Sequence, residues 1–128
     1  MTKKILVVED NSHNMKLILM TLKPHGYDLL KATDGEEALK IVSREKPDLI
    51  IMDVQLPKMS GLEVTRRLRK MPAFSHLPIV AITAYAMKGD EERIVEAGCD
   101  AYLPKPINTR EVPRIVAEML QQHQRDSD

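Results

Sequence analysis

The sequence is short of the residues that several common kinds of binding site need. It has a single cysteine, Cys99, among 128 residues, which excludes internal disulfides and paired-cysteine metal or redox motifs and favours a reducing, cytoplasmic setting. Its 19 basic and 19 acidic residues leave a formal net charge of +0, so there is no basic field to attract nucleic acid. The few aromatic side chains give no stacking platform for single strands: Phe74, Tyr27, Tyr85 and Tyr102. These shortages disfavour a nucleic-acid role.

Long hydrophobic runs are also missing. The N-terminus, MTKKILVVEDN, places two lysines before a very short apolar run and then acidic residues, unlike a signal peptide or a membrane span. We therefore expect no membrane association. A chain of this length fits one domain, which we predict over residues 1–122, followed by a polar tail at 123–128 and no effector domain.

The chain does have a regular alternation of two patterns. Short apolar runs predict strands at 4–10, 27–32, 48–53, 78–83 and 101–106. Apolar residues at helical spacing predict helices around 15–22 and 112–119, and further helices lie between the other strands. Five strands alternating with five helices, joined by short connections, predict a flavodoxin-like, doubly wound α/β fold in three layers.

The starts of three of these helices are marked by capping residues. Asp34 and Ser60 each stand three residues before a glutamate, the pattern of a helix N-terminus. Asp90 is predicted to cap the helix at 89–98, and Gly98 to end it.

Polar residues occur where the predicted strands end. The first predicted strand ends in Glu9 and Asp10, the third in Asp53 and the fourth in Thr83, and the fifth leads to Lys105. In a doubly wound sheet all carboxyl ends of the parallel strands meet at one edge, where ligands bind. We therefore expect these five residues to converge.

The three carboxylates at that edge favour a bound cation. Crowded carboxylates repel one another unless some are protonated or a cation lies among them. Only oxygen ligands are available, which favours a hard ion such as Mg²⁺, held by one or two carboxylates, waters and a phosphate. A strand-end aspartate, a metal ion and a lysine are the parts of a phosphoryl-transfer site.

Simpler interpretations of the same residues stay open. Asp10 or Asn11 could cap the next helix, and Asp53 could begin an Asx turn in DVQLP. Thr83 and Lys105 could be ordinary loop residues.

Four stretches resemble response-regulator receiver domains, in the expected order and at the expected elements: VVEDN, LIIMDVQLPKMSGLEV, IVAITAYA and YLPKPI. The resemblance covers residues 3–121 and implies the strand order 2-1-3-4-5 and a phosphoacceptor switch of a bacterial two-component system or phosphorelay. The stretch AMKGDEERIVEAGCDAYLPKPI is most similar to stand-alone regulators of bacterial cell-division and developmental phosphorelays. Receiver domains of hybrid kinases carry similar stretches, so that origin stays open.

The resemblance implies a role for each acidic residue. Asp53 would accept a phosphoryl group from a phosphohistidine on a sensor histidine kinase or histidine phosphotransfer protein. Mg²⁺, with Mn²⁺ as a substitute, would be bound by Asp10 directly, by Glu9 through water and by the backbone carbonyl of Gln55. Gln55 and Tyr85 would tune the lifetime of the phosphorylated form.

The resemblance also implies how the signal is read. Thr83 and Lys105 would hold the phosphoryl group, the Lys105–Pro106 peptide bond would be cis, and Tyr102 would move inward as Thr83 shifts. The protein would assist its own phosphorylation and dephosphorylation without turning over a separate substrate.

A downstream effector would bind the helix at 89–98 together with the strand and helix that follow it. That helix is expected to be easily displaced, because its apolar contribution is thin and consists chiefly of Ile94, Val95 and Ala97. We expect a monomer or a weak dimer.

Three other functions compete with this one. A phosphatase of the haloacid-dehalogenase type uses similar chemistry, but it typically has a second aspartate two residues after the nucleophile, where this chain has Gln55. A flavin or nucleotide module would need a phosphate-cradling loop, and the five glycines are scattered. A degenerate receiver could serve as a constitutive adaptor, although the complete set of site residues argues against it.

Overall fold

The computed structural model describes residues 2–84 and 88–127, without the side chains of residue 88 and residues 124–127. Within these ranges it contains five strands and five helices. The strands are β1 (Lys4–Val8), β2 (Asp28–Ala32), β3 (Leu49–Asp53), β4 (Ile79–Thr83) and β5 (Ala101–Pro104). The helices are α1 (Ser12–Leu22), α2 (Gly35–Glu45), α3 (Gly61–Arg69), α4 (Lys88–Ala97) and α5 (Glu111–Ser127). Two short 3₁₀ turns, η1 (Lys23–His25) and η2 (Pro72–Phe74), follow α1 and α3.

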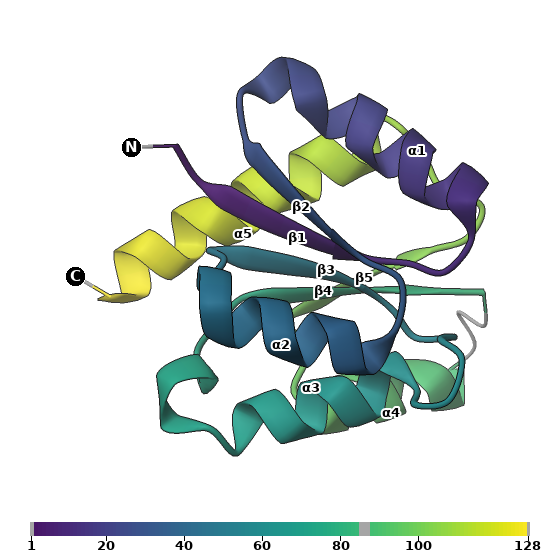
Figure 1. Cartoon of the computed structure of the whole chain (residues 1–128), viewed down its shortest axis with the longest axis vertical. Coiled ribbons are helices and arrows are strands. Elements are labelled where there is room, and N and C mark those ends of the chain that lie inside the picture. The colour runs from purple at the N-terminus through teal and green to yellow at the C-terminus, as the bar shows by residue number, and fades with distance from the viewer. Residues whose placement is uncertain (1, 85–87, 128) are drawn as a thin grey trace.

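The described strands form one parallel sheet in the order β2-β1-β3-β4-β5. Helices α1 and α5 cover one face of this sheet, and α2, α3 and α4 cover the other (Figure 1). This arrangement confirms the predicted doubly wound fold and its strand order. All five strands deliver their carboxyl ends to the same edge, as the candidate site requires.

The hydrophobic core lies on both sides of the sheet. In β1, Ile5 and Val7 pack towards α1 and α5, whereas Leu6 and Val8 pack towards α2, α3 and α4. Every residue of β3 and β4 is buried. Burial of each large aliphatic side chain contributes roughly 1.5–3 kcal/mol, so these central strands fix the sheet and leave polar groups only at their ends.

Side-chain caps begin three of the helices. Asn11, Asp34 and Ser60 each accept a hydrogen bond from the backbone N–H three residues later. The predicted caps at Asp34 and Ser60 are confirmed. Because Asn11 caps α1, the carboxylate of Asp10 is not used for this purpose.

Helix α4 differs from its prediction in two respects. It begins at Lys88, so Asp90 lies in the first turn and is not the cap. Ile94 and Ala97 are buried as expected, but Val95 is 65% exposed. Residues 94 and 97 lie three apart on the face towards the sheet, whereas residue 95 is rotated about 100° away from residue 94.

Helix α5 continues to Ser127, so it extends well past the helix predicted around 112–119 and into the polar tail. Gln124 and Arg125 have good helix propensity, which favours this extension. Neither α5 nor any other helix in the described ranges is long and apolar enough to cross a membrane.

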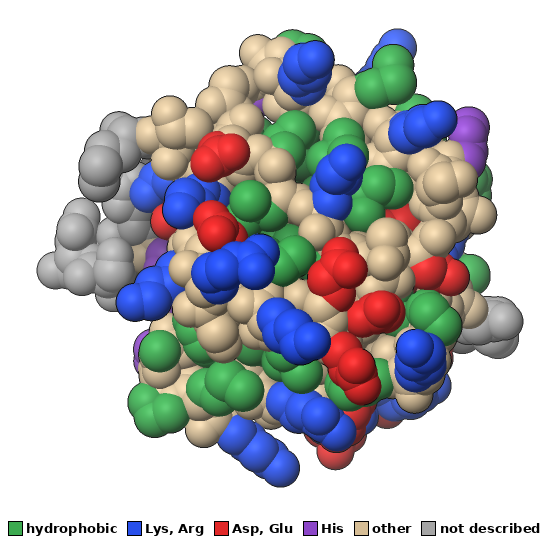
Figure 2. All heavy atoms as spheres, in the orientation of Figure 1, with side chains coloured by type: hydrophobic (Ala, Val, Ile, Leu, Met, Phe, Trp, Pro, Cys, Tyr) green, Lys and Arg blue, Asp and Glu red, His purple; other side chains and the backbone are tan. Residues whose placement is uncertain are grey.

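The surface carries both signs of charge. On the face towards the viewer, basic and acidic side chains are interspersed, and most of the acidic ones lie in the right-hand half (Figure 2). Large exposed hydrophobic side chains among the described residues are separate in the sequence: Met20, Met71 and Val95.

Candidate functional site

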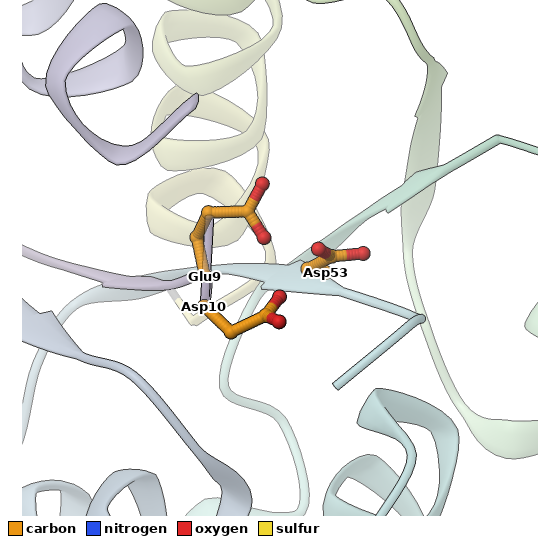
Figure 3. A group of neighbouring side chains, drawn as sticks. All are labelled: Glu9, Asp10 and Asp53. Atoms are coloured by element: carbon orange, nitrogen blue, oxygen red, sulfur yellow. The ribbon is translucent and has the colours of Figure 1, made fainter. Parts of the chain in front are cut away.

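Three acidic side chains meet where β1 and β3 end. Glu9 and Asp10 directly follow β1, and Asp53 is the last residue of β3. The two strands are neighbours, and Val8 pairs with Met52, which brings the next residues of both strands to the same level. The carboxylates of Glu9, Asp10 and Asp53 face a common space (Figure 3), with one oxygen of each within 4.8 Å of the others.

Glu9 is the most unusual of the three. Its side chain is buried, and neither carboxylate oxygen has a hydrogen-bond partner among the described residues. Burial, followed by the neighbouring carboxylate of Asp53, raises the pKa of Glu9 to about 8. A buried carboxylate without a partner is costly unless it is protonated or paired with a cation. The orphaned oxygens and the oxygen-only donor set therefore fit a hard divalent ion.

The two oxygens of Asp53 have different partners. Oδ1 accepts a hydrogen bond of 2.9 Å from the backbone N–H of Gln55, and Oδ2 accepts one of 3.0 Å from Nζ of Lys105. The Lys105 ammonium also lies 3.5 Å from Oε1 of Gln55. The first contact is the Asx turn of the simpler interpretation, and the second is an ion pair at the sheet edge. Both exist together, so the turn fixes the carboxylate while the lysine compensates its charge.

Thr83 ends β4, and Lys105 directly follows β5. Thr83 is fully buried at the end of β4, one residue beyond Ile82, which pairs with Asp53. The backbone N–H of Lys105 donates to the carbonyl of Thr83 over 2.8 Å, and the Lys105–Pro106 peptide bond is cis. The end of β4 and the loop after β5 are therefore held together beside Asp53.

Tyr102 belongs to different surroundings. Its ring packs against the core beneath α2, α3 and α4, and the Glu91 carboxylate on α4 raises the pKa of its hydroxyl. The described contacts of Tyr102 are thus with α4 and the core. Tyr85, expected to tune the phosphorylated lifetime, lies outside the described residues.

Comparison with known proteins places this geometry in a family. Residues 5–117 match the profile of the response regulator receiver domain. The chain belongs to this family. It is a phosphoacceptor signalling switch of two-component systems, and receiver domains interact with histidine kinases and downstream effectors.

Individual relatives cover most of this receiver domain. The polar-differentiation response regulator DivK of Brucella ovis is 49% identical over 116 residues, which are 91% of this chain and 92% of that protein. The receiver domain of a Pseudomonas aeruginosa sensor histidine kinase, solved with a magnesium ion in its active-site cleft, is 36% identical with a TM-score of 0.86, over 94% of this chain and 99% of that one. The Mn²⁺-bound form of the response regulator Rcp1 is 28% identical with a TM-score of 0.77, over 91% and 90% of the two chains.

Gly61 is a site residue that the sequence analysis missed. A Cβ atom at this position would lie 2.2 Å from the carbonyl oxygen of Asp53, and the Gly61 N–H donates to the carbonyl of Val54 over 2.9 Å. The first turn of α3 therefore packs directly against the backbone segment that carries the Asp53 side chain. The available signal was a glycine at the first helical position after the Ser60 cap, where helix propensity disfavours it.

The residue two positions after Asp53 distinguishes this site from that of a haloacid-dehalogenase-type phosphatase, which typically has an aspartate there. Gln55 stands there, with its N–H bound to Asp53 and its amide oxygen 3.5 Å from the Lys105 ammonium. An amide cannot exchange a proton as a carboxylic acid does, so this position offers no general acid or base.

Proposed function

We propose that Asp53 is the phosphoacceptor of this receiver domain. The observation that carries the proposal is the Asp53 carboxylate itself. It is 1% exposed, its two oxygens are held by a backbone N–H and an ammonium, and it faces two further carboxylates. A nucleophile fixed in this way needs little reorientation when a phosphoryl donor arrives.

The transfer step exchanges one bond to phosphorus for another. A carboxylate oxygen of Asp53 forms a bond to the phosphorus of a donor phosphohistidine as the P–N bond breaks. The electron pair stays on the imidazole, which takes a proton from solvent. The Lys105 ammonium then turns from the carboxylate to the phosphoryl oxygens, and the Thr83 hydroxyl donates a second hydrogen bond.

The proposed cofactor is Mg²⁺, and Mn²⁺ could replace it. Glu9, Asp10, Asp53 and the backbone carbonyl of Gln55 would hold the ion. When bound, it would supply positive charge that neutralises the transferring group. The orphaned oxygens of Glu9 support this assignment, as do the Mg²⁺ and Mn²⁺ ions in the similar receiver structures.

Phosphorylation would change the surface formed by α4, β5 and α5. Thr83 would move towards the phosphoryl group and Tyr102 would move inward. Thr83 pairs with Pro104, two residues beyond Tyr102 on β5, so a change at the end of β4 is transmitted over a short distance. Reversing a 1:99 equilibrium requires about 5.5 kcal/mol of differential stabilisation, which the new phosphoryl contacts and a bound partner would share.

The expected partners are proteins. A sensor histidine kinase or a histidine phosphotransfer protein would approach the acidic edge, and a downstream effector would bind the α4–β5–α5 surface. We propose a cytoplasmic monomer or weak dimer that binds neither nucleic acid nor membrane and turns over no separate substrate. The buried free thiol of Cys99 is compatible with a reducing compartment. Gln55 and Tyr85 would set the phosphorylated lifetime.

The test is intact-mass measurement after incubation with acetyl phosphate, with and without Mg²⁺. The wild type should gain one base-labile phosphoryl group that requires Mg²⁺, and Asp53→Asn should gain none. Asp34→Asn is the matched control, because asparagine caps α2 as well as aspartate does, and it should behave as the wild type. Folded protein that binds Mg²⁺ but gains no mass would refute the proposal and favour an adaptor.

A further inference from the structure

Arg69, at the end of α3, joins three segments at the opposite edge of the sheet from the acidic site. Its Nε donates to the carbonyl of Gly98, and its two terminal nitrogens donate to the carbonyl of Phe74 and to Oδ2 of Asp100, each over 2.9 Å. The side chain is only 18% exposed. A guanidinium with all three nitrogens engaged has one orientation, so η2, the end of α4 and the start of β5 are held in fixed relation.

Asp100 ties this junction to the sheet. The same Oδ2 that binds Arg69 accepts a hydrogen bond of 2.8 Å from the backbone N–H of Ile79, the first residue of β4. The backbone N–H of Asp100 in turn donates to the carbonyl of Ile79 over 2.9 Å. The carboxyl-terminal end of α4 is thereby attached to the amino-terminal end of β4.

The end of α4 is shaped to fit Arg69. The N–H of Gly98 donates to the carbonyl of Val95, and the N–H of Cys99 donates to that of Ile94, which together form a Schellman cap. Gly98 has a φ of 109°, and a Cβ atom there would lie 2.7 Å from Cγ of Arg69. Both the backbone conformation and the contact with Arg69 therefore require glycine at this position.

The two ends of α4 thus have different connections. Its amino-terminal end follows β4, which ends at Thr83 beside Asp53, whereas its carboxyl-terminal end is held at Arg69. A helix of 10 residues is about 15 Å long. With one end fixed, a rotation of about 10° moves the other end by roughly 2.5 Å, enough to remodel a binding surface.

We infer that Arg69 is the positioning residue on which α4 pivots when Asp53 is phosphorylated. Arg69 holds the carboxyl-terminal half of α4 in place, so the change is confined to the amino-terminal half and to the β5 surface next to it. The inference rests on the proposed function, because it concerns the response to phosphorylation of Asp53.

Hydrogen exchange measured by mass spectrometry tests the inference. The amides of residues 88–93 and 94–100 are compared with and without acetyl phosphate and Mg²⁺. In the wild type, phosphorylation should change exchange at 88–93 by at least about threefold and leave 94–100 unchanged. In Arg69→Met the phosphorylation-dependent change should extend to 94–100. If Arg69 had only a structural role, Arg69→Met would instead speed exchange at 94–100 by the same factor in the phosphorylated and unphosphorylated protein.

Arg67→Met is the matched control, since Arg67 lies on the same helix, is exposed and pairs only with Glu63 among the described residues. It should reproduce the wild-type pattern. Arg69→Lys keeps the charge but cannot bond all three acceptors at once. The phosphorylation-dependent change should therefore extend to 94–100 to a smaller degree than in Arg69→Met. This variant provides the test if Arg69→Met does not fold.

A wild-type change across all of α4, or an unaltered pattern in both Arg69 variants, would overturn the pivot. Intact mass measured on the same samples separates this result from failure of the proposed function. Absence of the phosphoryl adduct would overturn both.

Discussion

Replacing Glu9 with glutamine keeps the shape of the side chain and removes the group that titrates. In the ion-free protein, folding raises the pKa of Glu9 from 4.5 to about 8 because of burial and the neighbouring Asp53. Between these values the folded state binds a proton that the unfolded state has released. The stability contributed by this proton is complete below about pH 4.5 and is lost as the pH rises through about 8.

The size of the effect follows from the slope of this linkage. One pH unit corresponds to about 1.4 kcal/mol, so the free energy of unfolding should fall by roughly 2–3 kcal/mol between about pH 5.5 and pH 7.5. That is a large fraction of the stability of an ordinary domain. With a urea dependence of about 1.5 kcal/mol per molar, the unfolding midpoint moves by about 1.5–2 M.

The assay is urea unfolding at these two pH values in the presence of a chelator. The difference between wild type and Glu9→Gln cancels groups common to both proteins. Glu92→Gln, at an exposed position on α4, should follow the wild type. Saturating Mg²⁺ should reduce the wild-type pH dependence, because the ion favours the ionised carboxylate. Parallel pH profiles for wild type and Glu9→Gln would refute the reasoning.

Three further substitutions test the geometry around the acceptor. Lys105→Met removes the 3.0 Å ion pair to Asp53 and should slow phosphorylation by acetyl phosphate about 10- to 100-fold; an unchanged rate by intact mass would show that the ammonium is not needed. Gly61→Ala forces a Cβ atom against the Asp53 carbonyl and should lower unfolding stability by more than about 2 kcal/mol, whereas Gly89→Ala, which meets open space, should be neutral or stabilising; equal effects in urea would contradict this. Lys58→Gly relieves a positive φ of 68° and should raise the urea midpoint by the equivalent of up to about 1 kcal/mol, and a lower midpoint would argue against strain there.

Much of the fold could be predicted because its signals are local. A buried strand is a short apolar run, and a helix start is a capping residue with a carboxylate three residues later, so Asp34 and Ser60 were recognisable from neighbouring residues alone. The edge at which polar residues gather then follows from the parallel topology. Asp53 could therefore be placed at that edge before its contacts were known.

The errors occurred where local signals compete. Asp90 has the residue type of a cap, but an acidic residue is equally favourable inside the first turn of a helix, where it lies in α4. Val95 is apolar, but a short helix packed on one face buries only residues at matching spacing, here Ile94 and Ala97. Composition alone does not distinguish these cases.

The parts of the site that the sequence could not supply are distances between remote segments. Lys105 and Asp53 are 52 residues apart, and their pairing at 3.0 Å depends on the exact ends of β3 and β5. The carboxylate oxygens of Glu9 lack hydrogen-bond partners because no donor from a remote described segment lies within bonding distance, and the sequence does not show such distances. The close approach of Gly61 to the backbone of Asp53 likewise results from how α3 packs and is not encoded in a motif.

The two edges of the sheet differ in how completely their polar groups are satisfied, and this difference bears on how the switch works. At the carboxyl edge, the Lys105 ammonium pairs with Asp53, whereas Glu9 has no hydrogen-bond partner among the described residues. At the amino edge, all three guanidinium nitrogens of Arg69 donate hydrogen bonds, and Oδ2 of Asp100 accepts two. Free energies of local opening should therefore be lowest at the phosphoacceptor edge and highest at the Arg69 junction. A new charge at Asp53 therefore acts on the part of the molecule with the lowest free energy of local opening, while the Arg69 junction stays in place.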